Sequence, residues 1–128
     1  MKDSMKILVG IDGSEHAKEA LLEAIKAAER FSGFIKIVTV YKQGKEEEAT
    51  KILEEAQRLI KEVKIEHNLS SILGSNPARA LINTAKHENF DLIVVGSRGL
   101  SSAASFLLGS VSRQIVSKAN CDVLVVKK

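Results

Sequence analysis

The sequence predicts an α/β fold in which an open, parallel, Rossmann-like sheet carries helices on both faces. Five short segments with strand character alternate with four helical segments along the 128 residues. That alternation is typical of a parallel sheet with crossover helices. The strand segments at 7–9, 92–95 and 123–126 are continuously apolar, as expected of strands buried on both faces. The length favours a single domain covering residues 1–128.

The five strands are predicted from short runs of apolar and β-branched residues bounded by turn residues. They cover residues 7–11, 34–41, 64–73, 91–95 and 122–127. The third is the weakest of these predictions. Within it Ile65, His67 and Leu69 alternate with more polar residues, which is the pattern of a partly exposed edge strand.

The four helices are predicted from apolar residues at helical spacing and from the turn chemistry at their ends. Ser14 can cap the first helix, and Ser32-Gly33 ends it. A turn at Gln43-Gly44 precedes the second helix. Asn76-Pro77 starts the third, with a capping residue followed by proline at the first helical position. Asn89 is expected to terminate that helix in the left-handed conformation.

Composition and charge exclude several classes of function. The net charge of +3 comes from 19 basic and 16 acidic residues spread along the chain, which is too mild and too mixed for a nucleic-acid-binding surface. The single cysteine, Cys121, excludes an internal disulfide and fits a reducing compartment. The polar first residues lead into only a short apolar run, so we expect neither a signal peptide nor a membrane span. A cytoplasmic protein that binds neither nucleic acid nor membranes is expected.

The most informative segment is the glycine-rich stretch 96–110, which follows the apolar strand 92–95. Glycine lets the backbone approach a ligand closely, and free N–H groups at a helix start favour anions. The segment therefore predicts a nucleotide-phosphate site, with a flexible surface loop as the alternative. In open parallel sheets, ligands bind beyond the carboxyl ends of strands where the winding reverses. If the first and fourth strands are neighbours, the winding reverses between them, and Asp12-Gly13 then lies beside the glycine-rich stretch.

Taken together, these features resemble the universal stress protein family along essentially the whole chain. The resemblance is carried by residues 7–15, 74–78, 91–99, 108–113 and 120–126. Residues 96–110 also fit G-x2-G-x9-G-(S/T), the motif of the nucleotide-binding branch, at every fixed position. The resemblance implies the strand order 3-2-1-4-5, a homodimer, and an ATP site across the ends of the first and fourth strands.

The resemblance also implies where ATP would make its contacts. The ribose and phosphates would be surrounded by Gly96, Gly99, Gly109 and Ser110. Val111 and Ser112 would add contacts at the start of the last helix. The nucleoside would face Asp12 and the backbone of Gly10 and Ile11, and adenine would meet Val40. Their neighbours Val95, Ser97 and Arg98 complete the candidate set. Mg²⁺ would be held mainly by the phosphates, because the sequence shows no carboxylate cluster dedicated to it.

Several candidate residues also have structural interpretations. Asp12 can form an Asx turn at the start of the first helix. Ser97 can be a solvated turn residue, and Arg98 can be solvated instead of neutralising phosphate. Many family members have proline in place of Gly10, so glycine is expected to loosen the nucleoside-side loop. The three histidines lack metal-ligand spacing and are expected in surface or core positions. Cys121 is expected to be a small buried hydrophobe.

The expected function is an ATP-binding module that senses or signals energy or stress state without robust catalysis. Fast hydrolysis needs an oriented base and a charge stabiliser, and the sequence shows no such set. One alternative is a slow ATPase or an adenylyl-transferring enzyme. The other is a dimeric interaction scaffold with a vestigial glycine loop. Its dimer would pair the apolar strand 122–127 with its own copy, because exposed strand edges are hazardous when unpaired.

Overall fold

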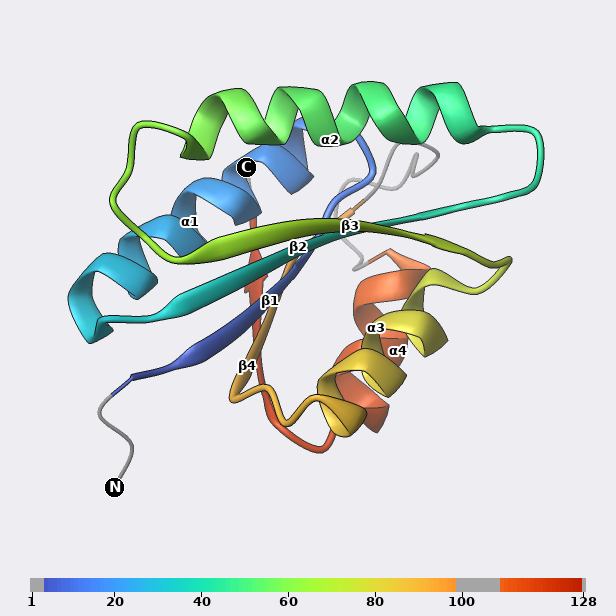
Figure 1. Cartoon of the computed structure of the whole chain (residues 1–128). Helices are drawn as coiled ribbons and strands as arrows, with labels where there is room; N and C mark the ends of the chain where they lie inside the picture. Colours follow the sequence, from blue (N-terminus) through green and yellow to red (C-terminus); the bar gives the residue numbers. More distant parts are fainter. Residues whose placement is uncertain (1–3, 99–108, 128) are drawn as a thin grey trace.

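The computed structural model describes residues 4–98 and 109–127, and strands alternate with helices along the chain (Figure 1). All strand pairs are parallel, and the sheet has the order β3-β2-β1-β4-β5. Both the predicted fold class and the predicted strand order are confirmed. The elements are β1 (Lys6–Gly10), α1 (Glu15–Phe31), β2 (Phe34–Tyr41), α2 (Glu46–Ile60), β3 (His67–Leu73), α3 (Pro77–His87), β4 (Leu92–Gly96), α4 (Ser110–Lys118) and β5 (Asp122–Val126).

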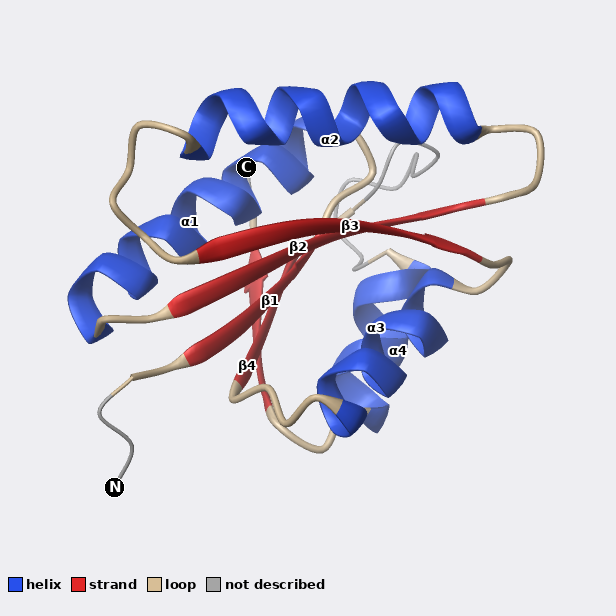
Figure 2. Cartoon of the chain, viewed as in Figure 1, coloured by secondary structure: helices blue, strands red, loops and turns tan. Residues whose placement is uncertain are grey.

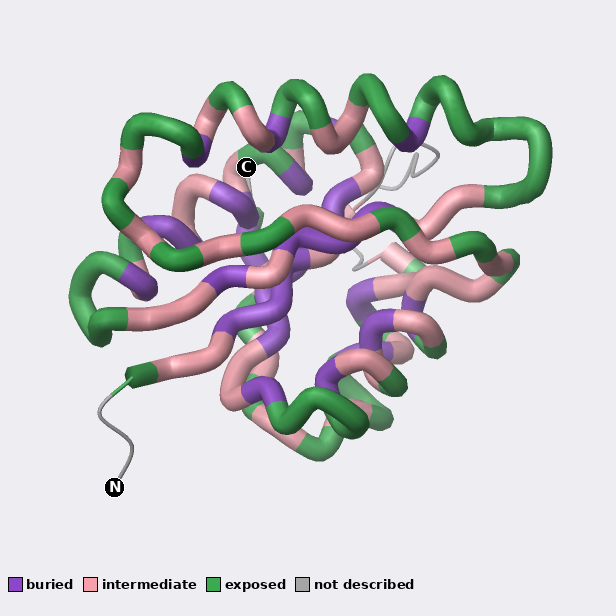
Figure 3. Tube along the Cα trace, viewed as in Figure 1, coloured by how far each residue is buried: buried purple, intermediate pink, exposed green. Residues whose placement is uncertain are grey.

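The sheet forms the middle of three layers. Figure 2 shows α1 and α2 on one face of the sheet and α3 and α4 on the other. Side chains of β1 alternate between two apolar cores, with Ile7 and Val9 on the α1/α2 face and Leu8 on the α3/α4 face. All three are fully buried, and Figure 3 shows burial concentrated in the central strands. Burial on both faces explains why the strand runs are continuously apolar.

The helix starts follow the predicted capping chemistry. The Oγ of Ser14 accepts a hydrogen bond from Ala17 N at 3.1 Å. The Oδ1 of Asn76 accepts one from Arg79 N at 3.1 Å, and Pro77 is the first residue of α3. These side chains satisfy backbone N–H groups that have no partner within the helix. Both predicted caps are confirmed.

Left-handed backbone occurs at the predicted turns. Asn89 has φ 58° just after α3, as expected, and Gly44 has φ 91° in the turn before α2. At the end of α1 the left-handed residue is Ser32, with φ 52°, and not its neighbour Gly33. Gly33 is needed for a different reason, because a Cβ there would lie 2.9 Å from the carbonyl oxygen of Met5.

The third strand is shorter than predicted. It begins at His67 and not at residue 64, because its ladder with β2 starts where Ile35 pairs with His67. Its alternating exposure confirms an edge strand. No helix within 4–98 or 109–127 is both long and apolar enough to span a membrane.

Candidate functional site

The carboxyl ends of β1 and β4 lie side by side at one edge of the sheet. Val9 of β1 pairs with Val94 of β4, so Gly10 and Gly96 end neighbouring parallel strands. The chain continues from β1 to β2 on one side, whereas β4 and β5 lie on the other. The winding therefore reverses between β1 and β4, which is where open α/β sheets bind ligands.

Gly96, the first glycine of the motif, lets α1 pack against the end of β4. A Cβ on Gly96 would lie 2.7 Å from the carbonyl carbon and the Cβ of His16, and 2.8 Å from its carbonyl oxygen. Backbone atoms of a helix cannot move aside as the end of a flexible side chain can. Glycine at this position therefore has a packing role whether or not a ligand is bound.

Ser97 joins four elements at this edge. Its N–H donates to Val126 O of β5 at 2.8 Å, and its carbonyl oxygen accepts the N–H of Gly109 at 2.7 Å. Its Oγ lies 3.0 Å from Nδ1 of His16 in α1. The side chain is only 6% exposed. The alternative of a solvated serine is therefore wrong, because these hydrogen bonds bury the residue.

The start of α4 is held in place by the same serine. Ser112 is 2% exposed, and its Oγ donates to Ser97 O and to Gly109 O, each at 3.0 Å. Since the proton of this hydroxyl is used within the fold, Ser112 can donate only its backbone N–H to a ligand. Gly109 is the N-cap residue and has no side chain with which to cap the helix. Helix geometry leaves the N–H groups of the first turn, from Ser110 onward, without intrahelical partners.

Asp12 forms an Asx turn, which the sequence predicted as the alternative to a contact with ligand. Its Oδ1 accepts a hydrogen bond from Ser14 N at 3.0 Å. Gly13 between them has φ 88°, a conformation that glycine adopts without steric cost. The turn holds the Asp12 carboxylate at the end of β1, beside the start of α1.

Gly10 and Ile11 are fixed by packing. A Cβ on Gly10 would lie 2.5 Å from Cδ1 of Leu81 in α3, so a leucine fills the space. The expectation that Gly10 loosens the nucleoside-side loop stays a prediction. Ile11 belongs to the α1/α2 core, and its N–H donates to Val38 O at 2.9 Å.

The remaining candidates differ in how accessible they are. Val95 is buried in the α3/α4 core, so its side chain packs within the fold. Val40 is half-buried on the same face of the sheet near the carboxyl end of β2. Arg98 is half-buried. Gly99, the second glycine of the motif, lies outside the described residues.

Two residues that shape the site were not predicted for it. His16 contacts both Gly96 and Ser97, and Leu81 fills the space over Gly10. His16 lies two residues after the capping Ser14, in the first turn of α1. This position, close to the end of β1, was the one signal in the sequence that could have placed His16 at the site. The contact with Ser97 is 81 residues away in sequence, so local pattern could not show it.

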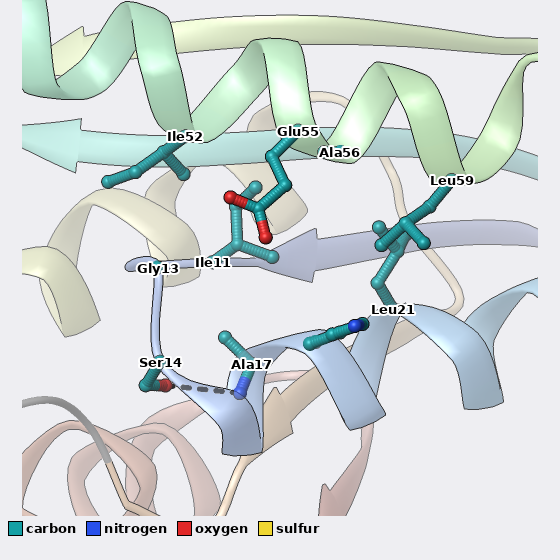
Figure 4. Close-up of a pocket in the computed structure, with 10 residues that line it drawn as sticks. Ile11, Gly13, Ser14, Ala17, Leu21, Ile52, Glu55, Ala56 and Leu59 are labelled. Atoms are coloured by element: carbon teal, nitrogen blue, oxygen red, sulfur yellow. Dashed lines mark hydrogen bonds between the residues drawn. The ribbon is translucent and has the colours of Figure 1, made fainter.

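A small cavity lies on the α1/α2 face of the sheet, between α1 and α2 (Figure 4). Its volume of about 30 Å³ suits one or two water molecules and is too small for a nucleotide. Of the described candidate residues, Ile11 alone lines it, together with Gly13 and Ser14 of the Asx turn. The cavity therefore lies beside the turn after β1, on the α1/α2 side of the edge.

Neither a metal cluster nor a reactive thiol is found in the described part of the chain. No group of three or more His, Cys, Asp or Glu side chains within 4–98 and 109–127 is placed to hold a metal ion. Cys121 is half-buried, not fully buried as expected. Burial raises the pKa of its thiol, and the carboxylates of Asp122 and Asp91 raise it further. The thiol therefore stays protonated at neutral pH and is a poor nucleophile.

The fold and this edge define a class of proteins, the doubly wound parallel α/β proteins. In this chain β1 and β4 each end in glycine at the point where the winding reverses, and α4 begins beside them. The chain belongs to the universal stress protein family, whose model matches residues 4–127. The Thermus aquaticus protein named "Universal stress protein in QAH/OAS sulfhydrylase 3'region" is 33% identical over 133 residues. That match covers 94% of this chain and 97% of the relative.

Solved structures show the same fold. A protein whose biochemical function was assigned from its structure superposes with a TM-score of 0.86 at 26% identity, covering 97% of this chain and 96% of the other. A universal stress protein in complex with cAMP has a TM-score of 0.78 at 28% identity, with 95% and 96% covered. The Archaeoglobus fulgidus universal stress protein in complex with dAMP has a TM-score of 0.79 at 25% identity, with 98% and 100% covered. Similar proteins thus bind adenine nucleotides.

Proposed function

We propose that this chain binds an adenine nucleotide, ATP in particular, at the carboxyl edge between β1 and β4. It would act there as a nucleotide-dependent sensor or signalling module without robust catalysis. The observation that carries the proposal is the position of the α4 start, which a hydrogen bond from Gly109 to Ser97 ties to the end of β4. The binding of cAMP and dAMP by structural relatives supports the same class of ligand.

The phosphates would bind at the start of α4. The N–H groups of Ser110, Val111 and Ser112 belong to the first turn of that helix, where backbone donors and the helix dipole favour anions. Gly109 supports this assignment because it leaves the helix without a side-chain cap. Gly96 and Gly99 would complete this side, and Arg98 would add positive charge.

The nucleoside would bind on the β1 and β2 side of the edge. Asp12 would face it with a carboxylate already oriented by the Asx turn to Ser14. The backbone of Gly10, Ile11 and Val95 would line its path. Val40 would meet the base, since its half-buried side chain stands near the carboxyl end of β2.

Mg²⁺ would bind mainly through the nucleotide phosphates. The described residues supply no cluster of three carboxylate, histidine or cysteine ligands, so the phosphates and water would provide most of the oxygen ligands that Mg²⁺ prefers. The metal would neutralise phosphate charge at the α4 start. In this proposal it is bound with the nucleotide and not before it.

The side chains at this edge of the sheet favour slow or absent hydrolysis of ATP. Rapid phosphoryl transfer needs a group that orients the nucleophile and a cation that stabilises the transferring phosphoryl group. The hydroxyls of Ser97 and Ser112 are occupied by hydrogen bonds within the fold, and His16 is engaged by Ser97. These residues would hold the site in shape and would not take part in chemistry.

A homodimer through β5 is part of the proposal. β5 is an edge strand, and Leu124 on β5 and Val116 on α4 are large apolar side chains exposed at 40% and 51%. Antiparallel pairing of β5 with its copy about a two-fold axis would satisfy the edge backbone and bury apolar surface.

Calorimetric titration of the purified full chain with ATP and Mg²⁺ tests the proposal. Charge-assisted hydrogen bonds to phosphate, offset by the entropy of association, lead us to expect an affinity of roughly micromolar. Mass spectrometry of small molecules released from freshly purified protein should show an adenine nucleotide. Protein that carries no nucleotide and gives no heat with ATP would refute the proposal, and rapid release of ADP or AMP would overturn the non-catalytic part of it.

A further inference from the structure

Gly74 directly follows β3, yet none of the residues that the structure describes requires glycine there. Glycine is needed where the backbone is left-handed or where another atom occupies the place of a Cβ. Five other glycines meet one of these conditions: Gly10, Gly13, Gly33, Gly44 and Gly96. Gly74 meets neither. Its φ lies outside the left-handed range, and among the described residues a Cβ there would meet only Cγ1 of Val40, at an ordinary 3.7 Å.

The place that a Cβ would take lies in an apolar corner at the edge of the sheet. We define this apolar corner as Val40, Ile72 and Gly74. Val40 pairs with Ile72 across β2 and β3, and both are half-buried on the α3/α4 face. The N–H of Gly74 donates to Tyr41 O at 2.9 Å, which fixes the glycine backbone beside Val40. Two residues further on, Asn76 caps α3.

We propose that Gly74 keeps the space beside Val40 open for the nucleobase and so determines which ligands fit this end of the site. The inference rests on the adenine-nucleotide binding proposed above. A planar base packs against an aliphatic side chain and a bare backbone without a gap. A methyl group in contact with Val40 would occupy the layer that the base needs.

The stability of the fold gives an independent reason for this assignment. Replacing glycine by alanine at a compatible backbone conformation stabilises a protein, because the unfolded chain becomes less flexible. A glycine at 74 therefore lowers stability without relieving any close contact among residues 4–98 and 109–127. The need to keep space for a ligand explains why glycine stands at position 74 despite this loss of stability. Binding sites in other proteins show the same conflict between function and stability.

The experiment compares wild type with Gly74→Ala and Gly74→Val, with Ser75→Ala as the matched control. Ser75 is exposed in the same turn and has no part in the proposed site. ATP affinity is measured by calorimetry, and the thermal midpoint by circular dichroism. One methylene more or less in a binding pocket changes the preference between two ligands about 10- to 200-fold. Gly74→Ala should therefore lower the affinity for ATP about tenfold, and Gly74→Val should lower it further. The thermal midpoint of Gly74→Ala should equal or exceed that of wild type, and Ser75→Ala should match wild type in both measurements.

The outcomes separate this inference from the proposed function. If wild type binds no ATP, the proposed function fails, and this inference fails with it. If wild type binds ATP and Gly74→Ala binds it within about threefold of wild type, only the role of Gly74 is overturned. A lower thermal midpoint in Gly74→Ala, or an equal loss of affinity in Ser75→Ala, also overturns it, because the glycine would then serve the fold or the turn as a whole.

Discussion

The carbonyl oxygen of Ser97 accepts the backbone N–H of Gly109 at 2.7 Å, which joins the end of β4 to the start of α4. Ser97 and Gly109 are also the second residue and the last glycine of the glycine-rich segment 96–110. Because Ser112 donates to the same carbonyl, the first turn of α4 is anchored by two bonds. The geometry of the proposed phosphate site therefore depends on one buried peptide group.

Replacing Gly109 with valine should abolish ATP binding and leave the fold intact. Gly109 has φ −65° and ψ 162°, which any residue can adopt, so the folded backbone is not strained. The branched side chain would instead stand at the start of α4, where the phosphates are proposed to bind. Calorimetry and circular dichroism measure the two effects.

Ser117→Val is the matched control, because it places the same side chain on an exposed position late in α4. It should bind ATP as wild type does. If Gly109→Val unfolds the chain, the glycine is structural and the interpretation of a phosphate path is wrong.

Gly96→Ala should destabilise the fold, in contrast to Gly74→Ala. The new Cβ would lie 2.7 Å from backbone carbon of His16, and relieving that clash requires α1 to shift from β4. Overpacking of this kind costs about 1–3 kcal/mol. Urea denaturation followed by circular dichroism gives the free energy of unfolding. Stability equal to that of wild type would show that α1 moves aside freely.

The contact between His16 and Ser97 should appear as coupling in a double-mutant cycle. Ser97→Ala and His16→Ala each remove the 3.0 Å contact between Oγ and Nδ1, and a hydrogen bond contributes about 0.5–1.5 kcal/mol to stability. The double variant should therefore lose less stability than the two single losses together. Free energies of unfolding in urea test this, and strict additivity would show that the two side chains do not stabilise each other.

Cys121 should react slowly with thiol reagents, and its reactivity should rise only at higher pH than in a free cysteine. Burial and the carboxylates of Asp122 and Asp91 raise its pKa above the ordinary 9.0, so less thiolate is present at a given pH. Reaction rates with a chromogenic disulfide between pH 7 and 10 measure the shift.

The same shift makes a prediction about stability. The unfolded chain loses the thiol proton more readily than the folded chain, so wild type should lose stability relative to Cys121→Ser as pH rises above about 9. Asp122→Asn should lower the pKa and speed the reaction. A reaction profile like that of free cysteine would contradict both expectations.

Leu124→Glu should convert the proposed dimer to monomer. Leu124 is exposed at 40% on the edge strand β5, and pairing about a two-fold axis would bring two added carboxylates together in an apolar interface. Light scattering at micromolar concentration reports the mass. Leu73→Glu, on the opposite edge strand β3, is the control and should leave the mass unchanged. A wild-type chain that is already monomeric would remove the dimer from the proposal.

Local sequence was enough to predict the layers of the fold. The continuous apolar runs at 7–9 and 92–95 predicted buried parallel strands because only strands covered on both faces exclude polar side chains. Ser14 and Asn76-Pro77 predicted helix starts because their chemistry satisfies backbone groups within three residues. The start of β3 was predicted three residues too early. The hydrophobic pattern of an edge strand is weak, so it does not mark where the strand begins.

The sequence by itself determined the fold class, the helix caps and the glycine spacing from Gly96 to Gly109, because each depends on residues close together in the chain. Only the tertiary structure decided what those glycines and serines touch. It placed α1 against Gly96, filled the space over Gly10 with Leu81, and buried Ser97 against His16. These contacts join residues more than 70 positions apart, and their partners are chosen by how helices pack on the sheet. Among the described residues, it also left only Val40 beside the place of a Cβ on Gly74, which no local pattern predicts.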